Sequence, residues 1–421
     1  MKTFSTLSRR HFLSTTASAA GTALALASSR FAAAAPVTAN DRINVGAIGI
    51  NGRGRYILNA FLQYPDVRVV AVCDVQGAKR KDAQQRVNEH YGNEDCRAYI
   101  DWRELIAQPD IDAVMIATGD NNHSLVSVHA ARAGKDIYCE KPLSVSIAES
   151  RAVADSVKRY ARIFQCGTQR RNVGNFMFAR ELAASGALGT IHTVYAEKAW
   201  PDSHMQFKVL PPEPTPAYED VAWDLWLGGA AWRPYNKEYH TGFWRTHGDF
   251  SGGSISEWGS HTIDLCQWAL GMDHTSPITY EAINPEGDIE AKYANGVRLI
   301  IKKGLRFGSC PVRFEGDEGW LETGDDNIIE TYPASLATGR HFAGGYPADN
   351  HVREFLNCIK SRQQPQSTAE SAHRSITACH CSNIALRLNR PVTWDPEREE
   401  FPGDEAANRM RYRVMREPFT V

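Results

Sequence analysis

A glycine-rich segment between an apolar run and a helical pattern is the feature that most constrains the fold of this chain. The run Ile43–Ile48 is followed by Gly-Ile-Asn-Gly-Arg-Gly at residues 49–54 and by a helical pattern over residues 56–62. A strand, a tight turn and a helix in this order bring backbone N–H groups and the positive end of a helix dipole together. This arrangement predicts a site for the pyrophosphate of a dinucleotide.

An acid at the end of the next apolar run completes this fingerprint. Asp74 follows Val67–Cys73, about 20 residues beyond the last glycine, where it can accept hydrogen bonds from an adenosine ribose. Asn51 stands where the G-x-G-x-x-G pattern has its second glycine, and asparagine tolerates a positive φ better than most residues. A strand–turn–helix unit without a ligand is the alternative. The predicted cofactor contacts here are Gly49, Asn51, Gly52, Arg53, Gly54 and Asp74.

The same acid bears on the choice between NAD and NADP. Asp74 favours NAD, because the 2′-phosphate of NADP would lie against its negative charge. Lys79 and Arg80 follow closely and leave NADP possible. We prefer to interpret these two side chains as part of a solvated helix face.

Apolar runs and helical patterns alternate from residue 41 to residue 166. Further strands are expected at residues 111–117, 136–139 and 163–166, and helices at residues 78–89, 126–133 and 147–160. This alternation predicts an α/β Rossmann domain, a doubly wound parallel sheet with helices on both faces.

Residues 1–35 predict an export signal. Arg9 and Arg10 precede a Phe-Leu pair, a weakly apolar stretch rich in Ala, Ser and Thr, and four consecutive alanines. The pattern resembles a twin-arginine (Tat) signal cleaved near Ala34. A general secretory signal or an uncleaved anchor is the alternative, although the stretch is far shorter than the ~20 apolar residues of a membrane span. We expect a periplasmic or secreted protein that uses the Tat export machinery and contacts no membrane after processing.

Charge and cysteine content exclude several classes of protein. The 421 residues carry 47 Lys and Arg against 49 Asp and Glu, too even a balance for a nucleic-acid-binding protein. The nine cysteines are an odd number without a C-x-x-C pair, which argues against a disulfide framework. In Cys379-His380-Cys381, neighbouring helical residues point apart, so we predict no metal site. Folding before export would let the protein load a cytoplasmic cofactor.

Short strands without intervening helices characterise the rest of the chain. Strands are expected at residues 194–199, 298–301, 312–314 and 320–322, and helices at residues 349–360 and 370–388. This order predicts an α+β domain over residues 167–395 with an open, mostly antiparallel sheet, followed by a tail at residues 396–421. The proline-rich residues 201–216 indicate a long loop that could act as a lid.

Two further motifs carry candidate chemistry. Lys141, in Cys-Glu-Lys-Pro-Leu after a predicted strand, could hydrogen-bond a substrate hydroxyl, and a common loop tripeptide is the alternative. Glu257, His261 and Asp264 have the spacing of one helical face, which suits acid–base work. Ser254 and Glu257 also fit a capping box, and His261 fits a satisfied core histidine.

These motifs together resemble the Gfo/Idh/MocA family (glucose–fructose oxidoreductase / inositol dehydrogenase), and the resemblance covers the whole mature chain. It rests on residues 49–54, Asp74, the Thr-Gly-Asp-Asn-Asn-His of residues 118–123 and Glu140-Lys141-Pro142. Residues 223–228, 232–236 and 351–355 are most similar to a secreted bacterial branch. The resemblance implies an antiparallel sheet that often forms a subunit interface, hence a homo-oligomer.

The same resemblance implies roles for single residues. It makes Thr118, Asn121, His123, Glu140 and Lys141 cofactor neighbours. It makes His261 the catalytic acid–base, with Lys141 beside it. Glu257 occupies the position of a family aspartate, a departure that moves the carboxylate by one methylene, and Asp264 is the last acid of the pattern.

Charged and aromatic residues near the domain junction are candidate substrate ligands. Arg170 and Arg171 follow the last predicted parallel strand and suit hydroxyl-rich or anionic groups, with an interdomain ion pair as the alternative. Asp264 is a third candidate. Four tryptophans could stack on a sugar ring, although each alone fits a core position better: Trp200, Trp232, Trp244 and Trp258.

The sequence thus predicts an exported NAD(P)-dependent oxidoreductase that acts on a sugar, polyol or glycoside hydroxyl with tightly bound NAD. His261 would take the hydroxyl proton, with Glu257 beside it and Lys141 stabilising the oxygen. The first alternative is an NAD-dependent glycoside hydrolase that oxidises its substrate transiently. The second is a non-catalytic sugar-binding protein.

Overall fold

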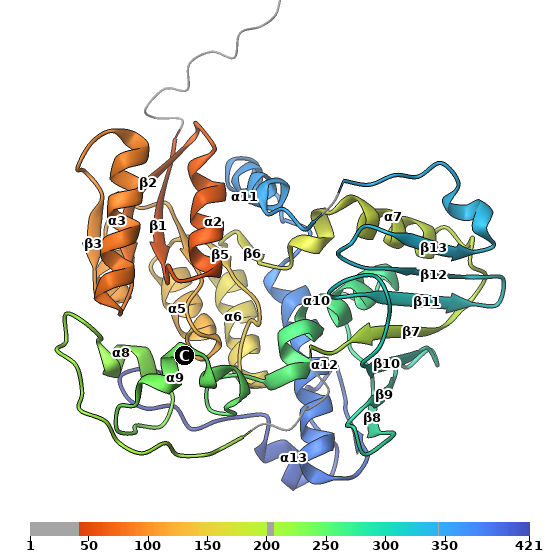
Figure 1. Ribbon diagram of the computed structural model, residues 1–421. Coiled ribbons are helices and arrows are strands. Elements are labelled where there is room, and N and C mark those ends of the chain that lie inside the picture. The colour runs from red at the N-terminus through yellow and green to blue at the C-terminus, as the bar shows by residue number, and fades with distance from the viewer. Residues whose placement is uncertain (1–41, 200–205, 344) are drawn as a thin grey trace, which may run out of the picture. The chain divides into compact units, whose positions relative to one another are not determined.

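The computed structural model describes residues 42–199, 206–343 and 345–421, and residues 43–421 form one compact unit (Figure 1). The predicted signal at residues 1–35 and Trp200 lie outside the described residues. The unit contains two sheets, each with its own helices.

The first sheet has six parallel strands in the order β3-β2-β1-β4-β5-β6. This confirms the doubly wound parallel sheet. Its strands are β1 (Ile43–Ile48), β2 (Val67–Cys73), β3 (Arg97–Tyr99), β4 (Ala113–Ile116), β5 (Asp136–Cys139) and β6 (Phe164–Cys166). The edge strand β3 was not predicted, because none of its three residues is buried and it therefore forms no apolar run.

Five helices connect these strands: α2 (Arg53–Leu62), α3 (Gly77–Tyr91), α4 (Trp102–Ile106), α5 (Asp120–Arg132) and α6 (Ile147–Arg159). Their ends follow local chemistry. Ser146 accepts a hydrogen bond from the backbone N–H of Glu149 at the start of α6, and Gly92 ends α3 in the left-handed conformation. The helices begin at the carboxyl ends of the strands, where a ligand crevice is expected.

The second sheet has eight strands in the order β13-β12-β11-β7-β10-β9-β8-β14. Only β7 and β10 are parallel, so the predicted mostly antiparallel sheet is confirmed. The strands are β7 (Ile191–Glu197), β8 (Thr279–Ala282), β9 (Ile289–Lys292), β10 (Arg298–Lys302), β11 (Val312–Gly316), β12 (Trp320–Thr323), β13 (Ile329–Tyr332) and β14 (Val392–Thr393). Three helices pack against it: α7 (Gly174–Ala184), α10 (Gly253–Ala269) and α12 (Ala369–Leu388).

Several segments of the second half of the chain return to the first sheet. Helix α11 (Asp349–Ser361) packs on α2, with Phe355 edge-on to Phe61 at 6.2 Å between ring centroids. The region expected to be a tail contains α13 (Glu405–Arg409) and then runs to α6 and α5. There Arg413 binds Glu149 and the carbonyl of Asn121.

The segment between β7 and α10 contains α8 (Trp223–Leu227), α9 (Lys237–Thr241) and the 3₁₀ turn η3 (Phe243–Thr246). Two other such turns are η2 (Gln169–Asn172) and η4 (Ala334–Ala337). In Figure 1 helices α8 and α9 lie beside the lower end of the first sheet, next to the C-terminus. The second half of the chain therefore supplies a wall to the crevice of the first.

Candidate active site

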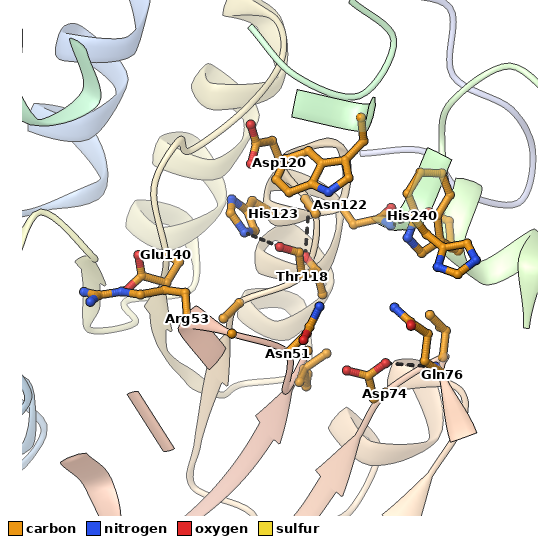
Figure 2. Close-up of a pocket in the computed structure, with 18 of the residues that line it drawn as sticks. Asn51, Arg53, Asp74, Gln76, Thr118, Asp120, Asn122, His123, Glu140 and His240 are labelled. Atoms are coloured by element: carbon orange, nitrogen blue, oxygen red, sulfur yellow. Dashed lines mark hydrogen bonds and ion pairs between the residues drawn. The ribbon is translucent and has the colours of Figure 1, made fainter. Parts of the chain in front are cut away.

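A cavity of about 360 Å³ lies at the carboxyl ends of the parallel strands (Figure 2). Ten residues predicted as cofactor or catalytic contacts line it: Gly49, Asn51, Gly52, Arg53, Asp74, Thr118, His123, Glu140, Lys141 and Glu257. The other wall comes from α8, α9 and η3 and includes Trp226, His240, Trp244 and Arg245.

The glycine turn has the shape that a pyrophosphate requires. Gly49 has φ +82°, and a Cβ there would lie 2.6 Å from the backbone of Ala117. A Cβ on Gly54 would lie 1.9 Å from the carbonyl oxygen of Gly49, so Gly54 permits close packing of helix and strand without itself lining the cavity.

The start of α2 is left open toward the cavity. Gly52 caps the helix without a side-chain hydrogen bond, its own Cβ position faces open space, and the first turn holds no acidic residue. A helix N-terminus without a side-chain cap and without a competing carboxylate fits an anionic diphosphate.

Asp74 lies where the fingerprint requires, and its carboxylate is fixed. Oδ2 accepts a hydrogen bond from the N–H of Ile50 at 2.7 Å, and Oδ1 accepts from the N–H of Gln76 at 2.8 Å. Each oxygen keeps a second lone pair for a ribose hydroxyl. Burial raises the pKa of Asp74, and the two N–H donors oppose that shift.

One of the two neighbouring basic residues does not belong to the predicted solvated face. Arg80 is buried, and its guanidinium donates to the carbonyl oxygens of Asp74 at 2.7 Å and Glu219 at 3.0 Å. That part of the prediction was wrong, because Arg80 ties two chain segments together. Because Arg80 donates to two carbonyl oxygens, its guanidinium is not available to a 2′-phosphate.

The loop before α5 supplies the middle of the cavity wall. One ring nitrogen of His123 lies 2.6 Å from the carbonyl oxygen of Pro142, and the other lies 3.2 Å from that of Thr118. Burial lowers the pKa of His123, and the two carbonyl contacts oppose that shift. Asn121 does not line the cavity, because its amide donates to the carbonyl oxygen of Leu227 at 3.0 Å and anchors α8.

The motif after β5 provides two ion pairs. Glu140 is buried and pairs with Arg53 at 3.0 Å, which links this loop to the glycine turn. The Lys141 Nζ donates to the carbonyl oxygen of Glu257 at 2.9 Å and lies 3.3 Å from its Oε1. Lys141 therefore reaches across the cavity to α10.

Glu257 forms a charged centre with Lys141 in the cavity and does not cap its own helix, α10. Helix α10 begins at Gly253, so Ser254 already lies inside it, and the carboxylate of Glu257 points to Lys141 and to Arg245 at 2.8 Å. Burial opposes ionisation of Glu257, but Lys141 and Arg245 outweigh it and lower its pKa. The capping-box interpretation was wrong.

Sequence reasoning missed Asp120, the first residue of α5. It lines the cavity at 2% exposure, and its Oδ2 has no hydrogen-bond partner among the residues that the structure describes. Asp120 lies inside the 118–123 motif that suggested the family. Its position at the start of the helix that follows Gly119 was the signal that could have identified it as a lining residue. Asn122 and Gln76 also line the cavity and were not predicted, although each lies close in sequence to a predicted contact.

The remaining candidates lie behind the cavity. His261 is buried on α10, one turn beyond Glu257, and its Nδ1 has no partner among the described residues. Burial and the charges of nearby cations, chiefly Arg170, hold the pKa of His261 well below its usual range. The role of His261 as acid–base stays a prediction.

Two predicted substrate-binding arginines are paired with acids. Arg171 and Asp264 form a bidentate ion pair, 2.7 Å for each contact, with both side chains at most 2% exposed. Arg170 likewise pairs with Asp325. None of the three candidates, Arg170, Arg171 and Asp264, lines the cavity. Both arginines form ion pairs, as the alternative expected, but their partners Asp264 and Asp325 lie in the same predicted domain, residues 167–395.

Of the tryptophans proposed to stack on a sugar, Trp244 lines the cavity, whereas Trp232 is exposed and Trp258 packs under Lys303. Trp226 was missed. It lines the cavity and stacks on Trp223 with ring centroids 4.9 Å apart. None of residues 206–216 lines the cavity, so the described part of the expected lid packs elsewhere.

A short segment of the second half of the chain is hydrogen-bonded beside Asp74. The N–H of Gly77 donates to the carbonyl oxygen of Asp220 at 2.8 Å, and the N–H of Ala222 donates to that of Val75 at 2.9 Å. A Cβ on Gly77 would lie 2.4 Å from the carbonyl oxygen of Glu219, so this close approach requires glycine.

Comparison with known proteins identifies the family. A model described as "Oxidoreductase family, NAD-binding Rossmann fold" matches residues 43–168, and one described as "Oxidoreductase family, C-terminal alpha/beta domain" matches residues 180–421. The chain belongs to the Gfo/Idh/MocA oxidoreductase family. Its first domain is therefore the NAD-binding Rossmann domain of that family, in agreement with the glycine turn and Asp74.

Two relatives of this chain are informative. Myo-inositol 2-dehydrogenase of Thermotoga maritima is 31% identical over 152 residues, 36% of this chain and 44% of that protein. Rhizopine catabolism protein MocA of Rhizobium meliloti is 26% identical over 350 residues, 80% of this chain and 90% of that protein. The match thus spans less than half the length of the inositol dehydrogenase.

A solved structure shows the same Gfo/Idh/MocA fold. Aldose-aldose oxidoreductase from Caulobacter crescentus, complexed with glycerol, aligns with a TM-score of 0.61 at 18% identity. The alignment covers 84% of this chain and 99% of that one.

Two other features of the described residues bear on the class of protein. No group of three or more His, Cys, Asp or Glu side chains there is placed to bind a metal ion. Among the helices that the structure describes, none has the length and apolar character needed to cross a membrane.

Proposed function

We propose that this protein is an NAD(P)-dependent oxidoreductase that oxidises or reduces a sugar, polyol or glycoside hydroxyl. The observation that carries the proposal is the charged centre of Lys141 and Glu257 in the cavity that also contains the glycine turn and Asp74. Relatives named as inositol, xylose and levoglucosan dehydrogenases support this reaction class.

The residues of the cavity divide into two groups by chemistry. The open N-terminus of α2 would hold the pyrophosphate of the dinucleotide, and Asp74 would hold its adenosine ribose. The bound nicotinamide supplies the hydride acceptor or donor. Lys141 would hydrogen-bond the substrate oxygen and stabilise negative charge on it, with Glu257 keeping the ammonium in position.

The chemistry is testable with cofactor-loaded protein, using the polyol myo-inositol and the sugars D-xylose and levoglucosan as probes. Reduction of bound nicotinamide is followed by its absorbance, in wild type, Lys141→Ala and His261→Ala. We expect Lys141→Ala to retain nucleotide and lose turnover. Wild-type turnover by both variants, with nucleotide bound, would remove Lys141 and His261 from the mechanism.

We also propose that the dinucleotide dissociates very slowly. The hydrogen bonds of Asp220 and Ala222 to the end of β2 and the start of α3 fix a chain segment beside the adenosine position. Leu225 and Trp226 of α8 continue the same wall. Mass spectrometry of the purified protein should find bound nucleotide after extensive dialysis, and nucleotide-free protein would contradict this.

Hydrolysis of glycosides and passive sugar binding are not proposed further, because the named relatives above are dehydrogenases and oxidoreductases. Release of phenol from aryl glycosides without an electron acceptor would revive the hydrolase alternative.

We propose export through the Tat pathway from the sequence of residues 8–35 alone. The paired Arg9 and Arg10 are its support. Replacing both with lysine should retain the protein in the cytoplasm, which cell fractionation would detect.

We likewise propose a homo-oligomer formed through the second sheet. Its charged and aromatic residues Tyr195, Arg313 and Trp320 are only half-buried, and Arg313 stacks on Trp320 at 4.0 Å from the ring centroid. Sedimentation equilibrium of wild type and Trp320→Glu would test the interface, and a monomeric wild type would contradict it.

A further inference from the structure

Asp120 is a cavity carboxylate to which the proposed roles assign no task. It is the first residue of α5, it lines the cavity, and only 2% of its surface is exposed. Its Oδ2 is fully buried and has no hydrogen-bond partner among residues 42–199, 206–343 and 345–421. A buried carboxylate oxygen without a donor costs free energy unless a proton or a ligand satisfies it.

Burial and the surrounding charges shift the pKa of the Asp120 carboxyl. Burial and the negative charge of Glu257 raise the pKa of Asp120 to about 7. Lys141, Arg245 and the hydroxyl of Ser251 act in the opposite direction. The N-terminus of α5 also favours the carboxylate, but burial outweighs it. An acid–base group transfers protons best when its pKa lies near the working pH.

The position of Asp120 in the cavity matches the reacting end of a dinucleotide. Figure 2 shows Asp120 at the opposite end of the pocket from Asp74 and Gln76. If Asp74 holds the adenosine ribose, Asp120 lies toward the nicotinamide. His261, the acid–base residue expected from sequence, does not line the cavity.

We propose that Asp120 is a further acid–base residue of this site and that its carboxylate exchanges the proton of the substrate hydroxyl. The inference rests on the proposed oxidoreductase function. In the oxidation direction the O–H bond of the substrate breaks and its proton forms a new O–H bond with Asp120. The C–H bond breaks with its electron pair, which leaves as hydride to oxidised nicotinamide, and the carbon–oxygen double bond forms.

The first test needs no substrate. Nucleotide-loaded protein labelled with carbon-13 at its aspartate carboxyls is titrated by NMR from about pH 5 to about pH 9. Wild type and the control Asp82→Asn, at an exposed position on α3, should show a carboxyl signal that titrates near neutral pH and is missing from Asp120→Asn. If Asp120→Asn keeps every neutral-range carboxyl signal of wild type, or if wild type shows none, the inference is overturned.

The second test uses the polyol that wild type oxidises. Asp120→Asn should lose about 10²–10⁴-fold in kcat, retain its nucleotide by mass spectrometry and lose the neutral limb of its pH–rate profile. Asp120→Glu should restore part of the rate. An unchanged pH–rate profile in Asp120→Asn would overturn the inference. If wild type oxidises none of the polyols, the proposed function fails, and the NMR titration still decides whether Asp120 holds the proton.

Discussion

Two charged clusters near the junction of the two halves of the chain contain similar residues. They differ in how completely their polar atoms are paired by hydrogen bonds and ion pairs. The cavity cluster consists of Asp120, Lys141, Arg245 and Glu257. One of its carboxylates has a buried oxygen without a partner in the part of the chain that the structure describes, and its Arg245 side chain is 48% exposed. A ligand can therefore change its protonation and its contacts.

The junction cluster consists of Arg171, Asp264 and Asp273. Arg171 binds both acids in bidentate fashion, donates to the carbonyl oxygen of Gln366 at 2.8 Å, and is fully buried. Ser375 donates a further hydrogen bond to Asp264. With its donors engaged, this cluster has little capacity to bind substrate, and its charges hold η2 to α10.

The comparison predicts that the first cluster controls activity. Lys141→Ala should lower kcat/KM for the oxidised polyol by about 10²–10⁴-fold, because the substrate oxygen loses its positive partner. Its urea-unfolding midpoint should stay close to that of wild type, because Arg245 still pairs with Glu257. Lys158→Ala, at an exposed position on α6, is the control. Unfolding of Lys141→Ala at much lower urea would make Lys141 a structural residue.

The second cluster should control stability instead. Arg171→Met leaves Asp264 buried without its cation, which should lower the free energy of unfolding by about 3–5 kcal/mol. Urea denaturation measures the change, with the exposed Arg409→Met as control. A variant of wild-type stability and hundredfold lower kcat/KM would instead place Arg171 among the substrate ligands.

In a third cluster, ion pairs to a carboxylate make the free energy of unfolding depend on pH. Asp66 pairs with Arg353 at 2.9 Å and Lys360 at 2.5 Å, and although burial opposes ionisation, these partners lower its pKa to about 2. Because the folded-state pKa is depressed, this stabilisation is present above about pH 4 and is lost as the pH falls toward 2.

Asp66→Asn should therefore lower the free energy of unfolding by about 2 kcal/mol at pH 7. The difference from wild type should shrink below about pH 4, which urea denaturation at a series of pH values would show. A difference that stays constant down to pH 3 would indicate that packing, and not charge, is lost.

The smallest effect is expected at the exposed rim of the cavity cluster. Arg245→Ala removes one partner of Glu257, but half of the Arg245 side chain is in solvent, where such a pair contributes about 0.2–1 kcal/mol. We expect less than about a fivefold change in kcat/KM. A loss as large as that of Lys141→Ala would show that Arg245 contacts the substrate directly.

The sequence by itself determined the first domain and one side of the site. Gly49, Asp74 and Lys141 line the cavity at positions set by local geometry at strand ends, and strand ends are readable from apolar runs. Four strands of the second sheet, β7, β10, β11 and β12, were also predictable from short apolar runs, whereas β8, β9, β13 and β14 were not predicted. The short exposed strand β3 was not predicted either, since it carries no buried face.

Only the tertiary structure decided which charged residues share the cavity. Glu257 and Asp264 lie on one helix and looked equivalent in sequence, yet one meets Lys141 and the other meets Arg171. Likewise, nothing in the local pattern around Trp226 or Arg245 shows that the segment after β7 folds back over the Rossmann strands. Such pairings depend on residues more than a hundred positions apart, and only packing of the whole chain brings them together.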